Sequence, residues 1–182
     1  MSTAGSTPWE PDLVVTHRLI VMRHSKAEQD GPTDFERPLA DRGRRDAADA
    51  GAWLAAEGFV PDHVLVSAAL RTEQTWEAVA AGAGWSLPPE LDRGLYSAGP
   101  ESALDIIRLV NDDVSVLMVV GHNPTMAYLA QLLDSGDGPA DAAAGLGGEF
   151  PTSAVAVFGH DGSWSDLADG SADLVASYVG RG

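Results

Sequence analysis

The stretch Leu19-Ile20-Val21-Met22-Arg23-His24-Ser25-Lys26-Ala27 decides how the chain is organised. Its first four residues close an apolar run over residues 17–22 that is typical of a buried strand. The run stops at a cation and an imidazole, Arg23 and His24. In an open α/β sheet, ligands bind beyond the carboxyl ends of the strands. The stretch therefore predicts a strand that delivers two polar side chains to a binding edge.

Two further predicted strands end in basic or imidazole side chains. The run over 62–66 leads through Ser67 to Arg71, and the nearly all-apolar run over 114–120 ends at Gly121-His122-Asn123. A continuous apolar run indicates a strand that is covered on both faces. A single histidine after a strand is more often a capping or core residue, but here two histidines and two arginines follow the ends of three predicted strands. We expect four side chains to converge at one edge of the sheet: Arg23, His24, Arg71 and His122.

Arg71 falls in the first turn of a helix predicted over 70–81, with Ser67 as a nearby cap. A cation at a helix start opposes the helix dipole at a cost of roughly 0.3–1 kcal/mol, which a bound anion would offset. The planar fork of arginine suits phosphate. Asn123 as N-cap and Pro124 as first helical residue would open another helix with free N–H groups for an anion.

The remaining pattern alternates strands with helices. It predicts helices over 41–58, 100–110 and 125–133, late strands over 154–158 and within 173–178, an irregular stretch over 82–96 and a loop over 134–151. Residues 1–16 are predicted to form a loose N-terminal tail, and residues 17–182 a single domain. The fold class is α/β, a three-layer α/β/α sandwich with a mostly parallel central sheet.

Composition limits the partners and the chemistry. The 182 residues carry a formal net charge of −16, which disfavours nucleic acid and anionic lipid as partners. No apolar run reaches the roughly 18–20 residues of a membrane span, and no secretory signal is recognisable. The absence of cysteine excludes disulfides and thiolate chemistry. A cytoplasmic location is the default expectation, and the oligomeric state is left open.

Other basic residues have ordinary interpretations. His17, His63 and His160 lack basic neighbours at a strand end and are expected to be structural or exposed. The arginines of the first predicted helix lie among acidic residues, as on a solvated face with local ion pairs. Arg93 and Arg108 are also assigned to the surface.

These motifs together resemble those of the histidine phosphatase superfamily, the phosphoglycerate-mutase-like group, and most of all its short bacterial phosphohistidine phosphatase branch. The resemblance covers roughly residues 18–178. The family opening of strand-Arg-His matches Arg23 and His24, and the second family histidine, after an apolar strand, matches His122. The other matching positions are Arg37-Pro38-Leu39 with Gly43, and the Ser67, Arg71, Gln74 and Thr75 segment.

The resemblance implies that His24 is a nucleophile that forms a phosphohistidine intermediate, which water hydrolyses. It implies that Arg23, Arg71 and His122 bind the equatorial oxygens, and that neither a metal nor another cofactor is needed. His24 must be neutral at its attacking nitrogen. His122 would work better protonated, a form that bound phosphate favours.

Some positions depart from the family pattern or stay open. Ser25 stands where the family has Gly, and Ala40 where a Thr often caps the first helix. The general acid is not assigned, although Glu90 and Asp92 lie in the right region. A site without an acid favours a leaving group such as imidazole, which needs less help than an alkoxide. Arg37 is either a substrate contact or part of a structural ion pair.

Three functions compete at this point. The first is a phosphatase acting on phosphohistidine in a protein or on a small phosphate compound. The second is a non-catalytic phosphate- or phosphoprotein-binding module that retains the fold, for which a nucleophile such as His24 would be unnecessary. The third, a mutase, would need a substrate-binding insertion that the sequence lacks.

Overall fold

The computed structural model describes residues 16–146 and 149–182, which form a six-stranded sheet between two layers of helices. The strand order is β3-β2-β4-β1-β5-β6. The pairings β2–β3, β2–β4 and β1–β4 are parallel, whereas β1–β5 and β5–β6 are antiparallel. The predicted three-layer α/β sandwich is confirmed, with a sheet that is parallel over four adjoining strands. The tail predicted for residues 1–16 lies, except for Thr16, outside the described residues.

The strands are β1 (Thr16–Arg23), β2 (His63–Ser67), β3 (Glu90–Asp92), β4 (Val116–Gly121), β5 (Ala154–Asp161) and β6 (Asp173–Val179). The helices are α1 (Asp41–Ala56), α2 (Leu70–Ala83), α3 (Gly94–Ser97), α4 (Pro100–Arg108) and α5 (Thr125–Leu133), with short 3₁₀ turns at Ala144–Leu146 and Trp164–Asp166. None of the helices within the described ranges is long and apolar enough to cross a bilayer.

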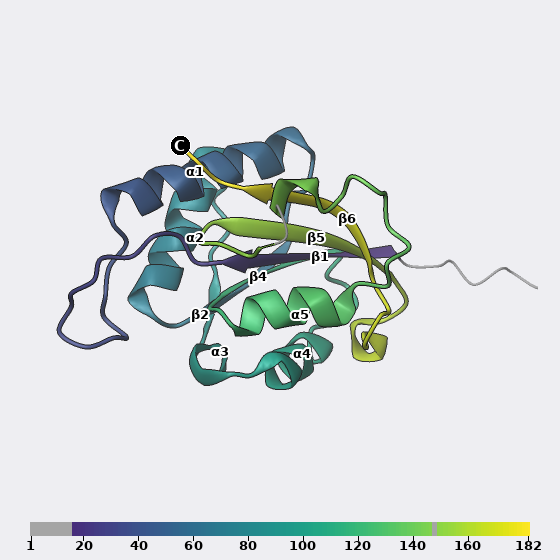
Figure 1. Cartoon of the computed structure of the whole chain (residues 1–182). Helices are drawn as coiled ribbons and strands as arrows, with labels where there is room; N and C mark the ends of the chain where they lie inside the picture. Colours follow the sequence, from purple (N-terminus) through teal and green to yellow (C-terminus); the bar gives the residue numbers. More distant parts are fainter. Residues whose placement is uncertain (1–15, 147–148) are drawn as a thin grey trace, which may run out of the picture.

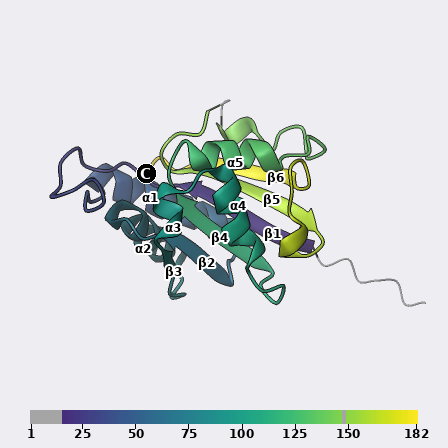
Figure 2. The ribbon, with the colours of Figure 1, turned by 90° about the horizontal axis from the view of Figure 1, so that it is seen from below.

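Alternation along β1 explains why helices cover both faces of the sheet. Leu19 and Val21 pack with α4 and α5, whereas Ile20 and Met22 pack with α1 and α2. All four side chains are fully buried. Figure 1 shows α1 above the sheet and α3, α4 and α5 below it, and Figure 2 shows the lower layer from beneath. The helix α2 packs against α1. Burial on both faces is why β1 and β4 read as continuous apolar runs.

Glycine allows the first helix to lie close to the segment that follows β1. A Cβ on Gly43 would lie 2.0 Å from the carbonyl oxygen of Lys26, so any larger residue would push these two segments apart. Lys26 is two residues beyond His24. Gly43, one of the positions that match the family motif, therefore allows the close packing that helps to place His24.

Three local expectations were wrong. The stretch over 82–96 contains β3 and α3, because a three-residue edge strand depends on pairing with β2 rather than on its own pattern. Ser67 does not cap α2, whose N-cap is Ala69 without a side-chain bond. Asn123 does not cap α5, whose N-cap is Pro124, and the Asn123 side chain bonds elsewhere.

Candidate active site

The parallel register of β1 and β4 places the two predicted histidines side by side. Arg23 pairs with Gly121, so His24 and His122 follow at the same edge. The backbone N–H of His24 donates to the carbonyl of Gly121 (2.9 Å), and the two imidazole rings lie 5.2 Å apart, centroid to centroid. Figure 1 shows the arrowhead of β1 pointing towards the protruding segment that leads to α1.

All four predicted catalytic residues line one pocket at this edge. It is lined by Arg23, His24, Lys26, Ala27, Gln29, Arg37, Arg71, His122, Asn123 and Thr152. Four of these side chains are cations and two are imidazoles, in a chain of net charge −16. The pocket therefore has the local positive field that an anionic ligand requires. No carboxylate is among its lining residues.

A backbone contact fixes the orientation of His24. Its Nδ1 lies 2.7 Å from the carbonyl oxygen of Ser25, and a carbonyl accepts only from a protonated nitrogen. The proton therefore sits on Nδ1 and leaves the lone pair on Nε2. Burial is the main cause that lowers the pKa of His24 to about 4, and the nearby Arg71 and Arg23 lower it further. His24 is consequently neutral at pH 7, as a nitrogen nucleophile must be.

Hydroxyl groups beneath His24 hold the turn that carries it. Ser25 is fully buried, and the hydroxyl of Ser153 donates to its hydroxyl (2.6 Å). The backbone N–H of Ser25 donates to the hydroxyl of Thr75 (3.0 Å), which in turn donates to the carbonyl of Arg71 (2.6 Å). The serine that replaces the family glycine is thus bonded within the core, and the network links His24 to the helix turn of Arg71.

His122 is held by Ser67. The Ser67 hydroxyl lies 2.8 Å from Nε2 of His122, so this side chain contacts the pocket histidine, and it makes no cap bond to α2. Burial first, then the proximity of His24 and Arg71, lowers the pKa of His122 to about 3. His122 is therefore neutral at pH 7, and a bound dianion would favour its protonated form.

Several nitrogens around the pocket have no hydrogen-bond partner within the described parts of the chain. They are Nε of Arg23, Nε of Arg71 and Nδ1 of His122, all buried. A buried donor without a partner costs roughly 1–3 kcal/mol. An oxyanion that accepts from the two arginine nitrogens, and from Nδ1 of His122 when that nitrogen carries a proton, would offset that cost, so the pocket is arranged for an anion.

Of Arg37, Glu90 and Asp92, only Arg37 lines the pocket. Arg37 also pairs with Asp34 (Nε to Oδ1, 2.9 Å), so the structure is compatible with a substrate contact and also contains the structural ion pair. Glu90 instead pairs with His63 (3.1 Å), and Asp92 accepts from the backbone N–H of Leu95 (3.0 Å). The structure does not bring these two carboxyl groups to the pocket of His24.

Sequence reasoning missed Asp34 and Tyr96. The Asp34 carboxylate accepts from Nη2 of Arg71 (3.1 Å) and from the hydroxyl of Tyr96 (2.7 Å). The Tyr96 ring meets the His122 ring edge-on, with centroids 5.6 Å apart. Asp34 lies in the irregular segment between β1 and α1, and Tyr96 lies in the four-residue helix α3, so neither periodicity nor a strand end marks them as functional.

The other histidines have structural surroundings. His17 is buried against Trp164 and contacts backbone carbonyls through both ring nitrogens. His160 likewise contacts the carbonyls of Ser171 and Ser163 (3.0 Å each). On α1, Arg42 pairs with Asp46 (3.5 Å) one turn along the helix. No three His, Asp or Glu side chains among the described residues are grouped so as to hold a metal ion.

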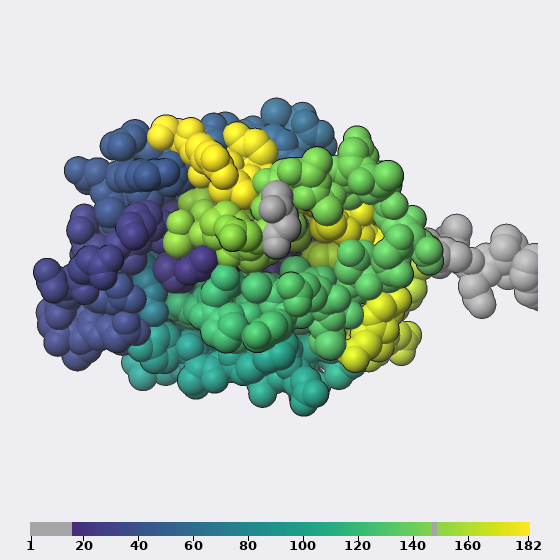
Figure 3. Space-filling model, in the orientation of Figure 1, coloured from purple at the N-terminus to yellow at the C-terminus, as the bar shows by residue number. Residues whose placement is uncertain are grey.

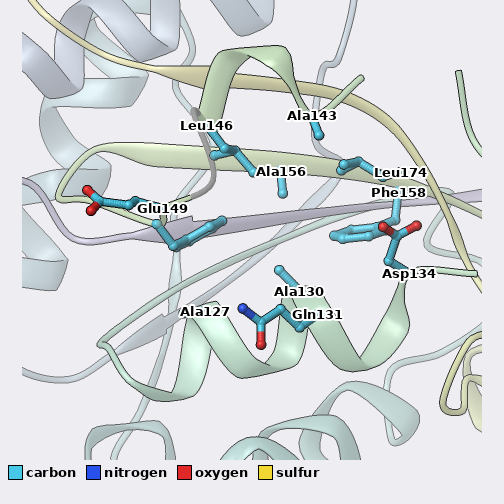
Figure 4. Close-up of a pocket in the computed structure, with 11 residues that line it drawn as sticks. Ala127, Ala130, Gln131, Asp134, Ala143, Leu146, Glu149, Ala156, Phe158 and Leu174 are labelled. Atoms are coloured by element: carbon cyan, nitrogen blue, oxygen red, sulfur yellow. The ribbon is translucent and has the colours of Figure 1, made fainter. Parts of the chain in front are cut away.

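A second, apolar cavity lies between α5 and the sheet. Its walls include Ala130, Ala156, Phe158 and Leu174, and Figure 4 shows its two carboxylates, Glu149 and Asp134, towards opposite ends. It contains no arginine, lysine or histidine. It therefore has neither a nucleophile of the kind predicted nor a charge that would hold phosphate, and the basic pocket is the candidate active site.

Comparison with known proteins agrees with this geometry. A model of the histidine phosphatase superfamily (branch 1) matches residues 19–97. An uncharacterized protein of Mycobacterium tuberculosis H37Rv is 43% identical over 162 residues, 88% of this chain and 100% of that one. The phosphohistidine phosphatase SixA of Escherichia coli K12 is 34% identical over 149 residues, 76% of this chain and 83% of SixA.

A solved structure of the protein histidine phosphatase SixA complexed with tungstate has a TM-score of 0.67 and 26% identity, over 89% of this chain and 96% of that one. The chain belongs to the histidine phosphatase superfamily, in the short bacterial branch that contains the phosphohistidine phosphatases. It is a phosphatase, and hence a hydrolase, rather than a non-catalytic phosphate-binding module.

Proposed function

We propose that this phosphatase removes the phosphoryl group from phosphohistidine in a protein, through a covalent intermediate on His24 and without a metal ion. One observation supports this proposal above the others. His24 has its Nε2 lone pair free, and the same pocket holds His122 and the buried Nε–H donors of Arg23 and Arg71, which have no partner among the described residues. A nucleophile and an oxyanion cradle in one pocket are what phosphoryl transfer needs.

The two steps follow from this arrangement. In the first, the lone pair on Nε2 of His24 forms a bond to phosphorus, and the bond to the leaving nitrogen breaks with its electron pair. In the second, a water oxygen attacks phosphorus, the bond to His24 breaks, and inorganic phosphate leaves. Arg23, Arg71 and His122 stabilise the charge on the three equatorial oxygens in both steps. A cytoplasmic location stays a prediction.

Turnover in the presence of a chelator tests the proposed function. With excess EDTA, the protein is expected to hydrolyse p-nitrophenyl phosphate and to bind inorganic phosphate as a competitive inhibitor. Loss of turnover in EDTA, restored by a divalent cation, would show that the reaction needs a metal. Phosphate binding without turnover of this ester or of a phosphohistidine peptide would contradict the assignment as an enzyme.

The protonation states of the two site histidines give a pH test. Because burial lowers the pKa of His24 to about 4 and that of His122 to about 3, both should stay neutral at pH 5 in NMR spectra of ¹⁵N-histidine-labelled protein. A histidine with the ordinary pKa near 6.5 would be only about 3% neutral there. Adding inorganic phosphate should raise the titration midpoint of His122.

The same lowered pKa values have a consequence for stability. As the pH falls below 6.5, the unfolded chain takes up protons at these histidines while the folded protein does not. The free energy of unfolding is therefore expected to decrease from pH 6.5 towards pH 4, and phosphate should oppose the decrease. A site histidine that titrates near 6.5 in the free protein would contradict both expectations.

A further inference from the structure

Asp34 joins the two arginines on one side of the pocket. Its Oδ1 accepts from Nε of Arg37 (2.9 Å), and its Oδ2 accepts from Nη2 of Arg71 (3.1 Å). Its backbone carbonyl accepts from Nη1 of Arg71 (2.7 Å). The hydroxyl of Tyr96 completes the set with a bond to Oδ2 (2.7 Å). A single acidic residue thus fixes two of the cations that line the pocket.

The contacts of Arg71 leave one edge of its guanidinium unused. A guanidinium has five N–H donors in a fixed planar fork. Asp34 takes one donor on each terminal nitrogen, whereas Nε is buried and has no partner among the described residues. An oxyanion can therefore meet the Nε edge while Asp34 keeps the opposite end.

We propose that Asp34 is a positioning residue that presents Arg71 and Arg37 to the phosphoryl group, so that its carboxylate increases the affinity for phosphate rather than competing with it. The proposal rests on the function proposed above, since it assumes that the pocket holds a phosphoryl group. Asp34 itself is not required to touch the substrate.

The segment that carries Asp34 is itself anchored. The carbonyl of Phe35 accepts from the backbone N–H of Leu70 (3.0 Å), at the start of α2. The Phe35 ring packs against the Tyr96 ring, with centroids 5.0 Å apart. The guanidinium carbon of Arg93 lies over the Phe35 ring, 5.8 Å from its centroid. Figure 3 shows the residues between β1 and α1, in purple and blue, as closely packed atoms at one edge of the molecule. Asp34 is therefore held by packing as well as by charge.

The exposure of Asp34 and Arg71 decides whether the Asp34 carboxylate supports phosphate binding or competes with the phosphate for arginine. The Asp34 side chain is 58% exposed, so water screens its repulsion of a bound phosphate, whereas the Arg71 side chain is only 7% exposed. The hydrogen bond from Tyr96 is the largest cause that lowers the pKa of Asp34 to about 2, and the arginines add to it. Asp34 thus remains an anion at neutral pH, screened on its outer side and bonded to arginines on its inner side.

The test compares Asp34→Asn with Asp30→Asn in the full-length protein. Both remove one negative charge from the same exposed segment, but Asp30 lies outside the arginine network. For Asp34→Asn, we expect the Kd for inorganic phosphate to rise about tenfold by calorimetry. KM should rise with it, while kcat changes less. For Asp30→Asn, both values should match those of the natural protein.

Tyr96→Phe provides a second variant, because it removes one bond to Asp34 and keeps the ring. We expect a smaller rise in the same Kd, with an unfolding midpoint close to that of the natural protein in both variants. An unchanged or lower phosphate Kd in Asp34→Asn would overturn the positioning role. A natural protein that neither binds phosphate nor turns over substrate would instead refute the proposed function itself.

Discussion

His24→Ala is expected to lower kcat by roughly 10⁴-fold or more, the scale of loss that follows removal of a catalytic nucleophile. No other histidine is prepared to take its place. His122 has one ring nitrogen bonded to Ser67 and the other buried, whereas Nε2 of His24 is free. The measurement is steady-state turnover of p-nitrophenyl phosphate in EDTA.

Two further measurements separate loss of the nucleophile from loss of the fold. The variant keeps Arg23, Arg71 and His122, so its Kd for inorganic phosphate should stay within a few-fold of that of the natural protein. His63→Gln serves as the matched control, because His63 pairs with Glu90 outside the pocket, and its activity should be unchanged. Brief mixing with a ³²P-labelled substrate should trap acid-labile phosphohistidine in the natural protein alone. Label in His24→Ala, with turnover within tenfold of normal, would assign the nucleophile to another residue.

The sequence predicts the centre of this fold because burial on both faces produces continuous apolar runs. Four consecutive positions of β1 and five of β4 are buried, so the apolar runs and their polar ends are visible without knowledge of the neighbouring strands. The strand β3 is different, because two of its three residues are exposed and only pairing with β2 makes it a strand. Short edge strands of this kind depend on tertiary contacts that no local pattern records.

The same distinction applies to the site. His24 and His122 could be predicted because each ends a buried strand, and parallel strands bring such ends together. Asp34 and Tyr96 are 62 residues apart, in a loop and in the short helix α3, and only the folded chain shows that they meet. The local pattern favours a helix-cap role for Ser67, whereas its hydroxyl bonds to a histidine 55 residues away. Long-range polar contacts were therefore the part of the site that sequence reasoning could not supply.

We expect the enzyme to prefer strongly those substrates whose leaving group departs without receiving a proton from the protein. The ten lining residues of the pocket include no carboxylic acid. Glu90 and Asp92 are engaged elsewhere, and Asp34 is kept ionised, with its pKa lowered to about 2 first by the hydrogen bond from Tyr96. None of these three carboxyl groups is thus placed to give a proton to a departing serine alkoxide. General acid catalysis typically contributes 10²–10⁴-fold, and this site would lack it.

Imidazole can leave without that help. Its conjugate acid has an ordinary pKa near 6.5, so it can depart as a neutral molecule once its outer nitrogen has taken a proton from solvent. We therefore expect kcat/KM for a phosphohistidine peptide to exceed that for a phosphoserine peptide of the same flanking sequence by at least about 100-fold. Rates measured with His24→Ala supply the uncatalysed background, which matters because phosphohistidine hydrolyses on its own. Equal kcat/KM values for the two peptides would mean that a proton donor reaches the pocket. If Asp34→Asn then lowered kcat/KM for the phosphoserine peptide alone, Asp34 would be that donor.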